Sequence, residues 1–338
     1  MWVDRGRILI TIKDVAEKAK TSVSTVSRVL SGKIPVSEPV KNKVIQVVNE
    51  LNYQPNIAAQ SLKNGKSKIL GLVIPNVRDL VFPAAIRGIE DSAQKHGYTV
   101  VLCNTDEDIA REKFYIEHLR RHLVDGFIFS TARKGHEHLL KLKEYGIPFV
   151  FLIRNMGNGV DSVVVDNFKG AYDAVSYMIS RGLRNIALIN GPIDISLYKQ
   201  RLEGYKFALK GESMVFSEKM VVNGVYGWED AYQAMVNLLK AGLKIDGVFA
   251  TSDSKAMGAI KAIKDYGYNI PEDISVMGFD NSDLAALADP PLTTVSQPFY
   301  KMGVAACERL LKLIEDNSKI KTKIQVLPTE LIIRKSIK

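Results

Sequence analysis

Residues 12–32 read IKDVAEKAKTSVSTVSRVLSG, and this stretch predicts two short helices joined by a tight turn. Its first half has apolar residues at positions i, i+3, i+4 and i+7, which fall on one face of a helix. These residues are Ile12, Val15, Ala16 and Ala19. Lys20 and Thr21 follow the stripe and form the predicted turn.

The second half predicts a helix with one buried and one exposed side. Ser22 can cap it by accepting a hydrogen bond from a first-turn amide, and Gly32 ends it. Val26 and Leu30 give it a narrow apolar side, and the other side presents Ser24, Thr25, Ser27 and Arg28. Short hydroxyl side chains allow close approach, and an arginine can bind a phosphate or a guanine edge. This face therefore suits the major groove of DNA.

A third helix is predicted after the loop at Pro35. Ser37 is its expected cap, and its apolar stripe comprises Val40, Val44, Val47, Val48 and Leu51. Three such stripes can close one small core. Residues 53–55 then break the pattern, and residues 56–63 could form a further short helix. So short a helix is marginal in water, so we expect it to form only against a partner or DNA.

Positive charge is concentrated in this N-terminal part. Residues 1–68 hold 12 Lys and Arg against 5 Asp and Glu, which gives them +7 of the net charge of +9. A basic head of this kind favours phosphate binding, although a solvated basic face would look similar.

The cysteines, the N-terminal residues and the lengths of the apolar runs indicate a cytoplasmic protein. Cys103 and Cys307 are isolated thiols that suit a reducing compartment, and both are expected to be buried apolar side chains. Residues 1–10 are too short for a secretory signal, so we expect a frayed extension. No window has the roughly 18 uninterrupted apolar residues of a membrane span.

From Lys68 onward, short apolar runs alternate with amphipathic segments. Strands are predicted at 69–74, 98–102, 127–129, 148–152, 162–165, 186–189, 247–250 and 275–278. Helices are predicted at 82–95, 110–122, 136–144, 169–180, 199–209, 229–239, 256–266 and 301–314, and final strands at 324–327 and 331–333. This alternation is typical of βαβ units in two similar lobes. Ligands bind at the carboxyl ends of such strands, so two facing lobes imply a cleft.

The opening motif and a series of later blocks resemble the lactose-repressor (LacI/GalR) family of bacterial transcription regulators. The later blocks, in order, are YQPNIAAQSLKNGKSKILGLVIP, DGFIF, QRLEGYKFAL, TSDSKAMGA, SVMGFDN and PPLTTVSQP. The resemblance covers essentially the whole chain from Thr11. It implies an all-α helix-turn-helix head plus an α/β two-lobed, periplasmic-binding-protein-like domain with two doubly wound parallel sheets.

The resemblance also implies domain boundaries. We expect an extension at 1–10, the DNA-binding head at 11–54, a hinge helix and linker at 55–67, and an effector-binding and dimerisation domain at 68–338. The first lobe is expected at about 68–166 and 298–327. The second is expected at about 167–297 and 328–338.

DNA contacts follow from the same resemblance. Val23 and Ser24 lie at the two variable base-reading positions, and Ser22, Thr25, Ser27 and Arg28 lie around them. The alternative for Val23 is that it only packs. In the hinge, Leu62 matches a leucine that wedges into the minor groove, a device that kinks DNA. Around it lie Asn56, Ala59 and Lys63, and the alternative for Leu62 is a small apolar patch between subunits.

Ligand contacts are implied in the cleft. Arg201 and Asp280 match a pair that holds ligand hydroxyls through charge-assisted hydrogen bonds. Phe82, Trp228 and Phe299 match aromatic residues that stack on a ligand. Ser252 and Asp253 begin a helix that faces the cleft, where Asp253 is either a ligand contact or a cap.

The sequence departs from the family pattern at three positions. Ile153 stands where many relatives have a ligand-binding aspartate before an arginine, here Arg154. Lys20 occupies a turn position that often has glycine or asparagine, because the turn requires an unfavourable backbone angle. Gln60 replaces a common arginine in the hinge.

Other chemistries receive less support. His118 and His122 share a helix face without a third metal ligand nearby, and His136 and His138 have poor metal spacing, so no metal or cofactor is expected. The motifs GxGxxG, GxxxxGK[ST] and GxSxG are absent, so we expect no enzyme activity. A periplasmic-type sugar-binding protein is the main alternative, but the basic head and the lack of an export signal argue against it.

The sequence thus predicts a transcription regulator, a repressor in the simplest case. It would bind a palindromic operator as a homodimer, because a single helix-turn-helix reads only a few base pairs. A small-molecule effector in the cleft, a sugar or sugar derivative, would control it. A catabolite-control type of regulator that uses a protein corepressor stays open as a further alternative.

Overall fold

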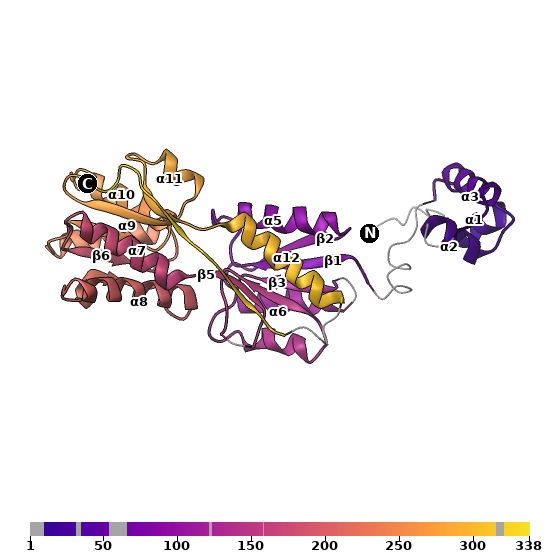
Figure 1. The fold of residues 1–338 in the computed structure, drawn as a ribbon, viewed down its shortest axis with the longest axis horizontal. Coiled ribbons are helices and arrows are strands. Elements are labelled where there is room, and N and C mark those ends of the chain that lie inside the picture. Colours follow the sequence, from indigo (N-terminus) through magenta and orange to yellow (C-terminus); the bar gives the residue numbers. More distant parts are fainter. Residues whose placement is uncertain (1–9, 32–34, 54–65, 122–123, 158, 316–320) are drawn as a thin grey trace, which may run out of the picture. The chain divides into compact units, whose positions relative to one another are not determined.

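The structure is a computed structural model that describes residues 10–31, 35–53, 66–121, 124–157, 159–315 and 321–338. The chain divides into two compact units, Met1–Ser67 and Lys68–Lys338. The first is a small helical body and the second is built from two α/β lobes (Figure 1). No helix in the described ranges has both the length and the apolar character needed to cross a membrane.

The first unit is built on the helices α1 (Ile12–Lys18), α2 (Val23–Ser31) and α3 (Glu38–Glu50). Their apolar stripes meet in one core, as the sequence predicted. The buried residues of this core are Val15, Ala16, Ala19, Val26, Val44, Val47 and Tyr53. The predicted pair of helices joined by a turn is therefore confirmed.

The turn between α1 and α2 contains a residue in the left-handed region. Lys20 has a φ of 53°, which glycine adopts at a lower cost than lysine. The amide of Thr21 donates to the Ala16 carbonyl at 2.9 Å and closes the turn. Ser22 Oγ then accepts a hydrogen bond from the Thr25 amide at 3.1 Å, which confirms the predicted cap of α2.

Two six-stranded sheets form the centre of the second unit within the described residues. Their strand orders are β11-β5-β4-β3-β1-β2 and β12-β10-β9-β8-β6-β7. The first sheet contains β1 (Ile69–Ile74), β2 (Thr99–Asn104), β3 (Gly126–Phe129), β4 (Phe149–Leu152), β5 (Ser162–Val165) and β11 (Ile324–Leu327). The second contains β6 (Ile186–Ile189), β7 (Val221–Val222), β8 (Gly247–Ala250), β9 (Ser275–Asp280), β10 (Thr293–Ser296) and β12 (Glu330–Ile332). All neighbours pair in parallel except β10 and β12, so the predicted doubly wound parallel sheets are confirmed.

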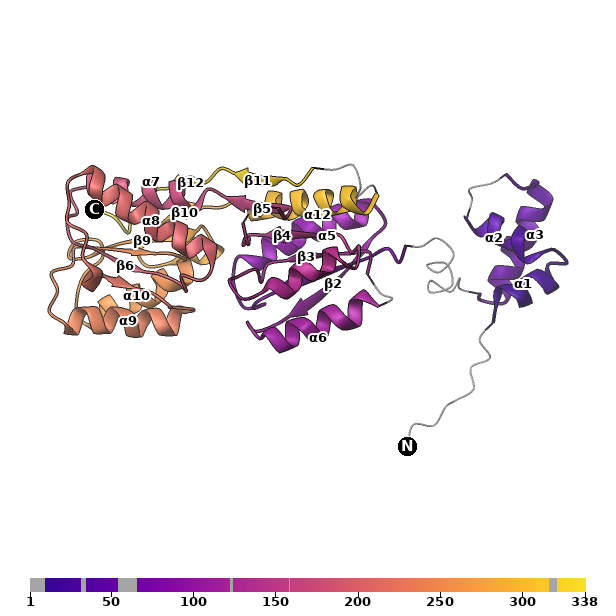
Figure 2. The same ribbon diagram turned by 90° about the horizontal axis from the view of Figure 1, so that it is seen from below.

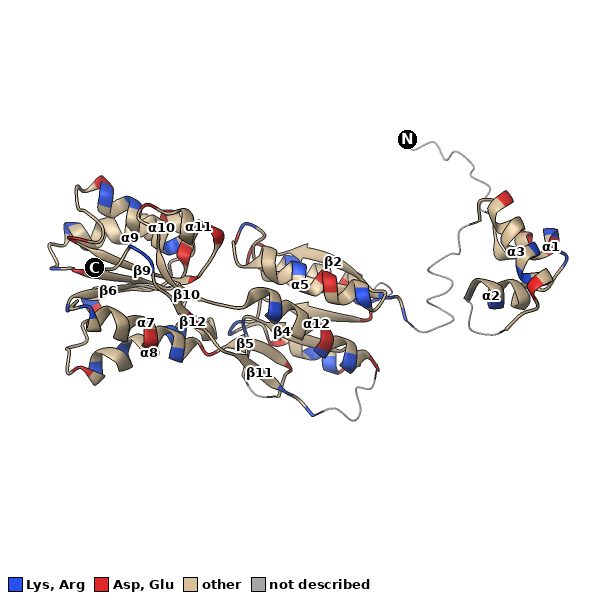
Figure 3. Cartoon of the chain, turned by 45° about the horizontal axis from the view of Figure 1, so that its top comes forward, with Lys and Arg blue, Asp and Glu red and all other residues tan. Residues whose placement is uncertain are grey.

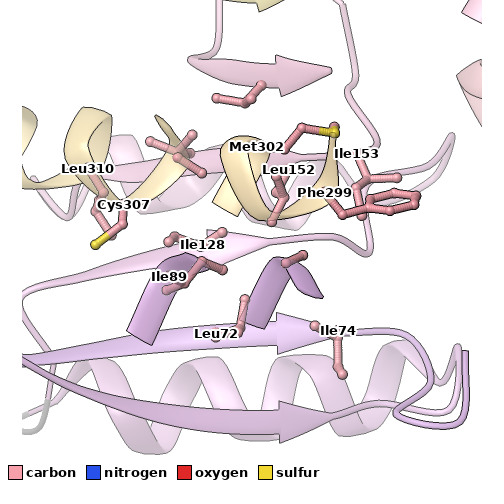
Figure 4. Close-up of a cluster of buried hydrophobic side chains, with 14 of the residues drawn as sticks. Leu72, Ile74, Ile89, Ile128, Leu152, Ile153, Phe299, Met302, Cys307 and Leu310 are labelled. Atoms are coloured by element: carbon pink, nitrogen blue, oxygen red, sulfur yellow. The ribbon is translucent and has the colours of Figure 1, made fainter. Parts of the chain in front are cut away.

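We call the parts built on these sheets the first and second lobes. Alternate residues of each first-lobe strand face opposite sides of the sheet. Ile128 of β3 packs with α5 (Phe82–Lys95) and α12 (Phe299–Glu315), in the core drawn in Figure 4. Phe129 packs with α6 (Ile109–Arg120) and the 3-10 helix η1 (Glu137–Lys143) on the other side. Both cysteines are buried in these two cores, as expected.

The second sheet is covered on both faces in the same way. The helices α9 (Trp228–Lys240) and α10 (Asp253–Asp265) cover one face, and α7 (Asn167–Ser180) and α8 (Ser196–Gly211) cover the other (Figure 2). The chain passes between the lobes after β5, between β10 and α12, and between β11 and β12. On the outer helices, basic and acidic residues are interspersed (Figure 3).

Several local predictions were incomplete or wrong. The strands β7 and β10 and the helix α11 (Asp283–Leu287) were missed. β7 has two residues and β10 reads TTVS, so neither contains the long apolar run from which strands were predicted. The helix predicted at 136–144 is the 3-10 helix η1. Ser37 precedes α3, but its side chain makes no capping hydrogen bond.

Candidate functional sites

The exposed side of α2 carries the residues predicted to read DNA. Val26 is fully buried and anchors the helix on the core. On the other side, Val23 is 41% exposed, so it is not a core residue. Ser22, Ser24 and Arg28 are also exposed, and Thr25 and Ser27 are half-buried. The hydroxyls of Ser24 and Thr25 lie 2.7 and 2.9 Å from Ser22 Oγ, so the first turn of α2 presents a hydroxyl cluster.

The predicted hinge and linker at 55–67 lie outside the described residues, apart from residues 66 and 67. They include Asn56, Ala59, Leu62 and Lys63, together with the unusual Gln60. Their roles stay predictions. The predicted N-terminal extension also lies outside the described residues, apart from Ile10.

A cavity of about 500 Å³ lies between the two lobes of the second unit. Its walls follow the carboxyl ends of several strands: Asn76 comes after β1, Arg154 after β4, Ser252 after β8, and Asp280 ends β9. This is where doubly wound sheets bind ligands. The predicted effector residues that line it are Phe82, Arg201, Trp228, Ser252, Asp280 and Phe299. Its size lies within the range of small-molecule sites.

Arg201 is fixed in the cavity wall by several contacts. Its Nε donates to Asn167 Oδ1 at 2.9 Å and its Nη1 donates to the Thr251 carbonyl at 2.5 Å. Its guanidinium carbon lies 3.6 Å from the centroid of the Phe279 ring, which is a cation–π arrangement. Because these contacts come from three different segments, the guanidinium has a defined position before any ligand binds.

Asp280 lies opposite Arg201, with 3.9 Å between Oδ1 and Nη1. Gln297 Nε2 donates to the same Oδ1 at 2.7 Å. Burial raises the pKa of Asp280 well above its usual range, and the attraction of Arg201 opposes that shift. The residue also has a φ of 122°, which is a strained backbone conformation for an aspartate. Such strain at a cavity wall is typical of a functional position.

Lys255 is a cavity residue that the sequence analysis missed. It lies on α10 and its side chain is almost fully buried. Its ammonium group lies 3.2 Å from Ser252 Oγ and 3.4 Å from the Tyr198 hydroxyl, both of which are neutral. A buried charge favours stronger acceptors than these. The block TSDSKAMGA contains Lys255, but its position on the cavity side of α10 depends on the tertiary fold.

The aromatic residues of the cavity differ in their exposure. Phe82 and Phe299 are almost fully buried at the first positions of α5 and α12. Trp228 begins α9 and is 47% exposed. Its indole ring therefore has a face that a ligand can cover.

Asp253 does not line the cavity, unlike its neighbour Ser252. Thr294 Oγ1 donates to its Oδ1 and the Ser282 amide donates to its Oδ2, both at 2.6 Å. Burial raises its pKa to about 6, although both hydrogen bonds favour the charged form. The Asp253 carboxylate therefore ties α10 to the β9–β10 region. Ser252 caps α10 by accepting a hydrogen bond from the Lys255 amide.

An ionic network joins the lobes next to the cavity. Arg133, after β3, donates to Asp194 of the second lobe at 2.5 and 2.8 Å and to Glu107 at 3.3 Å. Arg154 donates to Glu107 at 2.7 Å. Glu107, Arg154 and the unusual Ile153 all line the cavity, and Ile153 has a φ of 68°. The network connects cavity residues directly to a contact between the lobes.

A helix-turn-helix head followed by a two-lobed α/β unit is the architecture of a DNA-binding transcription regulator. Residues 11–56 match the model of the bacterial regulatory proteins of the lacI family, and residues 175–337 match a periplasmic binding protein-like domain. The ribose operon repressor of Halalkalibacterium halodurans is 38% identical over 98% of each chain. The protein is therefore a member of the lacI family of transcription regulators.

Two solved structures extend this comparison. The lac repressor dimer bound to operator and the anti-inducer ONPF has a TM-score of 0.88 and 27% identity, over 97% of this chain and 99% of that one. A LacI family regulator of Enterococcus faecium with bound ribose has a TM-score of 0.70 and 31% identity, over 79% of this chain and 98% of that one. These relatives are transcription regulators, in agreement with the expected class.

Proposed function

We propose that the protein is a repressor that binds a palindromic operator as a homodimer and responds to a sugar or sugar derivative in the cavity. The observation that carries the proposal is the cavity itself, in which Arg201 and Asp280 face each other at 3.9 Å. That spacing is too long for a hydrogen bond between them. A ligand hydroxyl can bridge the two groups, because it donates to the carboxylate and accepts from the guanidinium.

The ligand class follows from the other cavity groups. Lys255 offers a buried cation that lacks a charged partner among the described residues within salt-bridge distance. Trp228 offers an exposed ring face of the kind that stacks on a sugar ring. Several hydroxyls and one flat apolar face are the combination that a sugar presents. Relatives described with ribose make D-ribose the first ligand to test.

DNA binding is assigned to two segments. Residues 11–54 form the head, in which Val23 and Ser24 read base edges while Ser22, Thr25, Ser27 and Arg28 contact the surrounding groove and phosphates. The exposure of Val23 supports this role. In the hinge at 55–67, we assign the minor-groove wedge to Leu62, with Asn56, Ala59 and Lys63 beside it.

We assign the control of DNA binding to the two lobes. The first lobe comprises residues of about 68–166 and 298–327, and the second comprises residues of about 167–297 and 328–338. Ligand binding changes the relation between the lobes and thereby the spacing of the paired hinges. A hinge helix of this length is only marginally stable, so a small change in free energy decides whether it forms. Coupling of this kind is typically about 1 to 3 kcal/mol. In the simplest form, the sugar releases the operator, and the protein acts in the cytoplasm, where the DNA is.

A thermal-shift screen of the full chain against free sugars and sugar phosphates tests the ligand assignment. A ligand that binds the native state raises the melting temperature. At the same concentration, D-ribose or a close relative should raise the melting temperature more in the wild type than in Asp280→Asn. If no sugar raises the melting temperature, the effector assignment is wrong. If sedimentation shows a monomer that has full operator affinity, the proposed homodimer is wrong.

A further inference from the structure

Three side chains in the first lobe form a cluster that lies outside the cavity described above. Glu112 lies on α6, and His136 and His138 lie at the start of η1, after β3. His138 Nε2 is 2.6 Å and His136 Nδ1 is 2.9 Å from the same oxygen, Glu112 Oε1. The two histidines are separated from Glu112 by more than twenty residues in sequence. The spacing of the histidines alone therefore gave no indication of the cluster.

The cluster is buried and its hydrogen bonding is incomplete. Glu112 is 1% and His136 is 2% exposed. His136 Nδ1 lies 2.9 Å from Glu112 Oε1 but does not have hydrogen-bond geometry, and neither His136 Nε2 nor Glu112 Oε2 has a hydrogen-bond partner among the described residues. Buried polar atoms are normally hydrogen-bonded, so unpartnered atoms on two adjacent residues need an explanation. A single bound ion that accepts electron pairs from all three residues would explain these unpartnered atoms.

The charge of the cluster points in the same direction. The only salt-bridge partners of the Glu112 carboxylate in the described ranges are the two imidazoles, and no Lys or Arg there pairs with it. A carboxylate that is buried beside two imidazoles and has no Lys or Arg partner favours a bound cation.

We propose that Glu112, His136 and His138 bind a divalent transition-metal ion such as Zn²⁺. The three ligand atoms all lie within 4.8 Å of one another, so one ion can reach them together. Two imidazole nitrogens and one carboxylate oxygen are a ligand set that zinc uses with one position left open. Hard cations such as Mg²⁺ and Ca²⁺ prefer sets made of oxygen only.

The geometry needs only small movements to accept the ion. Metal bonds of about 2.0 to 2.1 Å place neighbouring ligand atoms about 3.3 Å apart in a tetrahedral site. The contacts of 2.6 and 2.9 Å would therefore open by less than about 1 Å, and a separation of up to 4.8 Å between the other ligand atoms would close by up to about 1.5 Å. His138 has 14% of its side chain exposed, which gives an ion a path from solvent. The unpartnered Glu112 Oε2 can complete the coordination, as can water.

Metal binding would also fix the loop that carries Arg133. His136 and Arg133 both lie between β3 and η1, and Arg133 contacts Asp194 of the second lobe. An ion at His136 would therefore restrict the loop that joins the lobes. The site does not depend on the sugar assignment, because none of its three ligands lines the cavity.

The test uses the full-length protein stripped with a chelator and titrated with Co²⁺ and with Zn²⁺. Visible Co²⁺ absorption reports nitrogen and oxygen coordination, and calorimetry with Zn²⁺ reports stoichiometry and affinity. The wild type should bind one ion per chain. His138→Gln and Glu112→Gln should each lose about 100-fold or more in affinity, beyond the range seen when only an outer-shell partner is removed.

The matched control is His118→Gln, which removes an exposed histidine from the same helix as Glu112. It should bind both ions as the wild type does. Circular dichroism and the melting temperature of each metal-free variant establish that it is folded. His138→Gln is the decisive variant because its side chain is partly exposed. The proposal is overturned if the wild type binds neither ion, or if folded His138→Gln binds as tightly as the wild type.

Discussion

Asp280 Oδ1 lies 3.9 Å from Arg201 Nη1, and both side chains are almost completely buried. Arg201 attracts the charged form of Asp280, but the separation is too long for a hydrogen bond between the two side chains. Arg201 is fixed by Asn167 and Thr251, and Asp280 is fixed by Gln297. The gap is therefore held open by its surroundings, and a ligand hydroxyl can fill it without displacing either residue.

Replacing Asp280 by asparagine should weaken ligand binding and leave operator binding intact. The variant keeps the size of the side chain but loses the charged acceptor. A hydrogen bond to a charged group contributes about 1.5 to 3 kcal/mol, which corresponds to about a 10- to 100-fold loss in affinity. Calorimetry with the sugar measures the loss. Asp283→Asn, an exposed neighbour that does not line the cavity, is the control. Equal affinities for both variants would contradict the assigned role of Asp280.

Replacing Arg201 by alanine separates two roles of this residue. Loss of the ligand response with retained operator binding indicates a ligand contact. Loss of both would indicate that the contacts to Asn167 and Thr251 mainly stabilise the fold. Truncation leaves Asp280 without its opposite charge, so we also expect a lower melting temperature. Fluorescence anisotropy with operator DNA and a thermal melt distinguish these outcomes.

Base preference should change when Ser24 is replaced. Ser24 is exposed on α2 and its hydroxyl lies 2.7 Å from Ser22 Oγ. Selection of duplexes from a random pool should give a different preferred half-site for Ser24→Asn. Replacing the exposed Lys13 by alanine should instead weaken binding to all sequences about equally and reduce the salt dependence. A uniform loss for Ser24→Asn would show that this residue does not read bases.

The packing of α5 against α12 should not tolerate a methyl group at Gly88. An added Cβ there would lie 2.2 Å from the Tyr300 carbonyl oxygen, which belongs to the backbone. Gly88→Ala should therefore destabilise the protein, by about 1 to 3 kcal/mol or more. At Gly211, the last residue of α8, a Cβ would meet nothing within 4 Å. Gly211→Ala should be neutral or slightly stabilising because alanine favours the helix. Urea unfolding of both variants measures the difference.

Asp253 should make stability depend on pH. Burial raises its native pKa to about 6, whereas an unfolded aspartate titrates near about 3.9. The native state therefore binds the proton more tightly. This contribution to the free energy of unfolding is fully present below about pH 4 and is lost as the pH rises through about 6, by at most about 3 kcal/mol. Asp253→Asn cannot titrate, so its unfolding free energy should lack this decline. If the unfolding free energies of the wild type and Asp253→Asn change in parallel between about pH 4 and pH 7, the raised pKa of Asp253 is contradicted.

The sequence predicted the elements whose signal is local. The apolar runs of β1 and β5 and the stripe of α5 were located with the bounds that the structure shows. β10 was missed because its polar TTVS run is buried by tertiary packing. The same reason explains why Lys255 and the contact of Glu112 with His136 and His138 were not found. Each depends on side chains that only the folded chain brings together.

The most direct test of the account is operator binding by the wild type with and without its sugar. A palindromic duplex selected from a random pool is titrated with the full-length protein at one fixed salt concentration. We predict that the sugar identified by thermal shift weakens binding about 5- to 150-fold, as expected for a coupling of about 1 to 3 kcal/mol. For Asp280→Asn the same effect should require about a 10- to 100-fold higher sugar concentration. Unchanged operator affinity of the wild type at a saturating sugar concentration would contradict ligand control through the cavity.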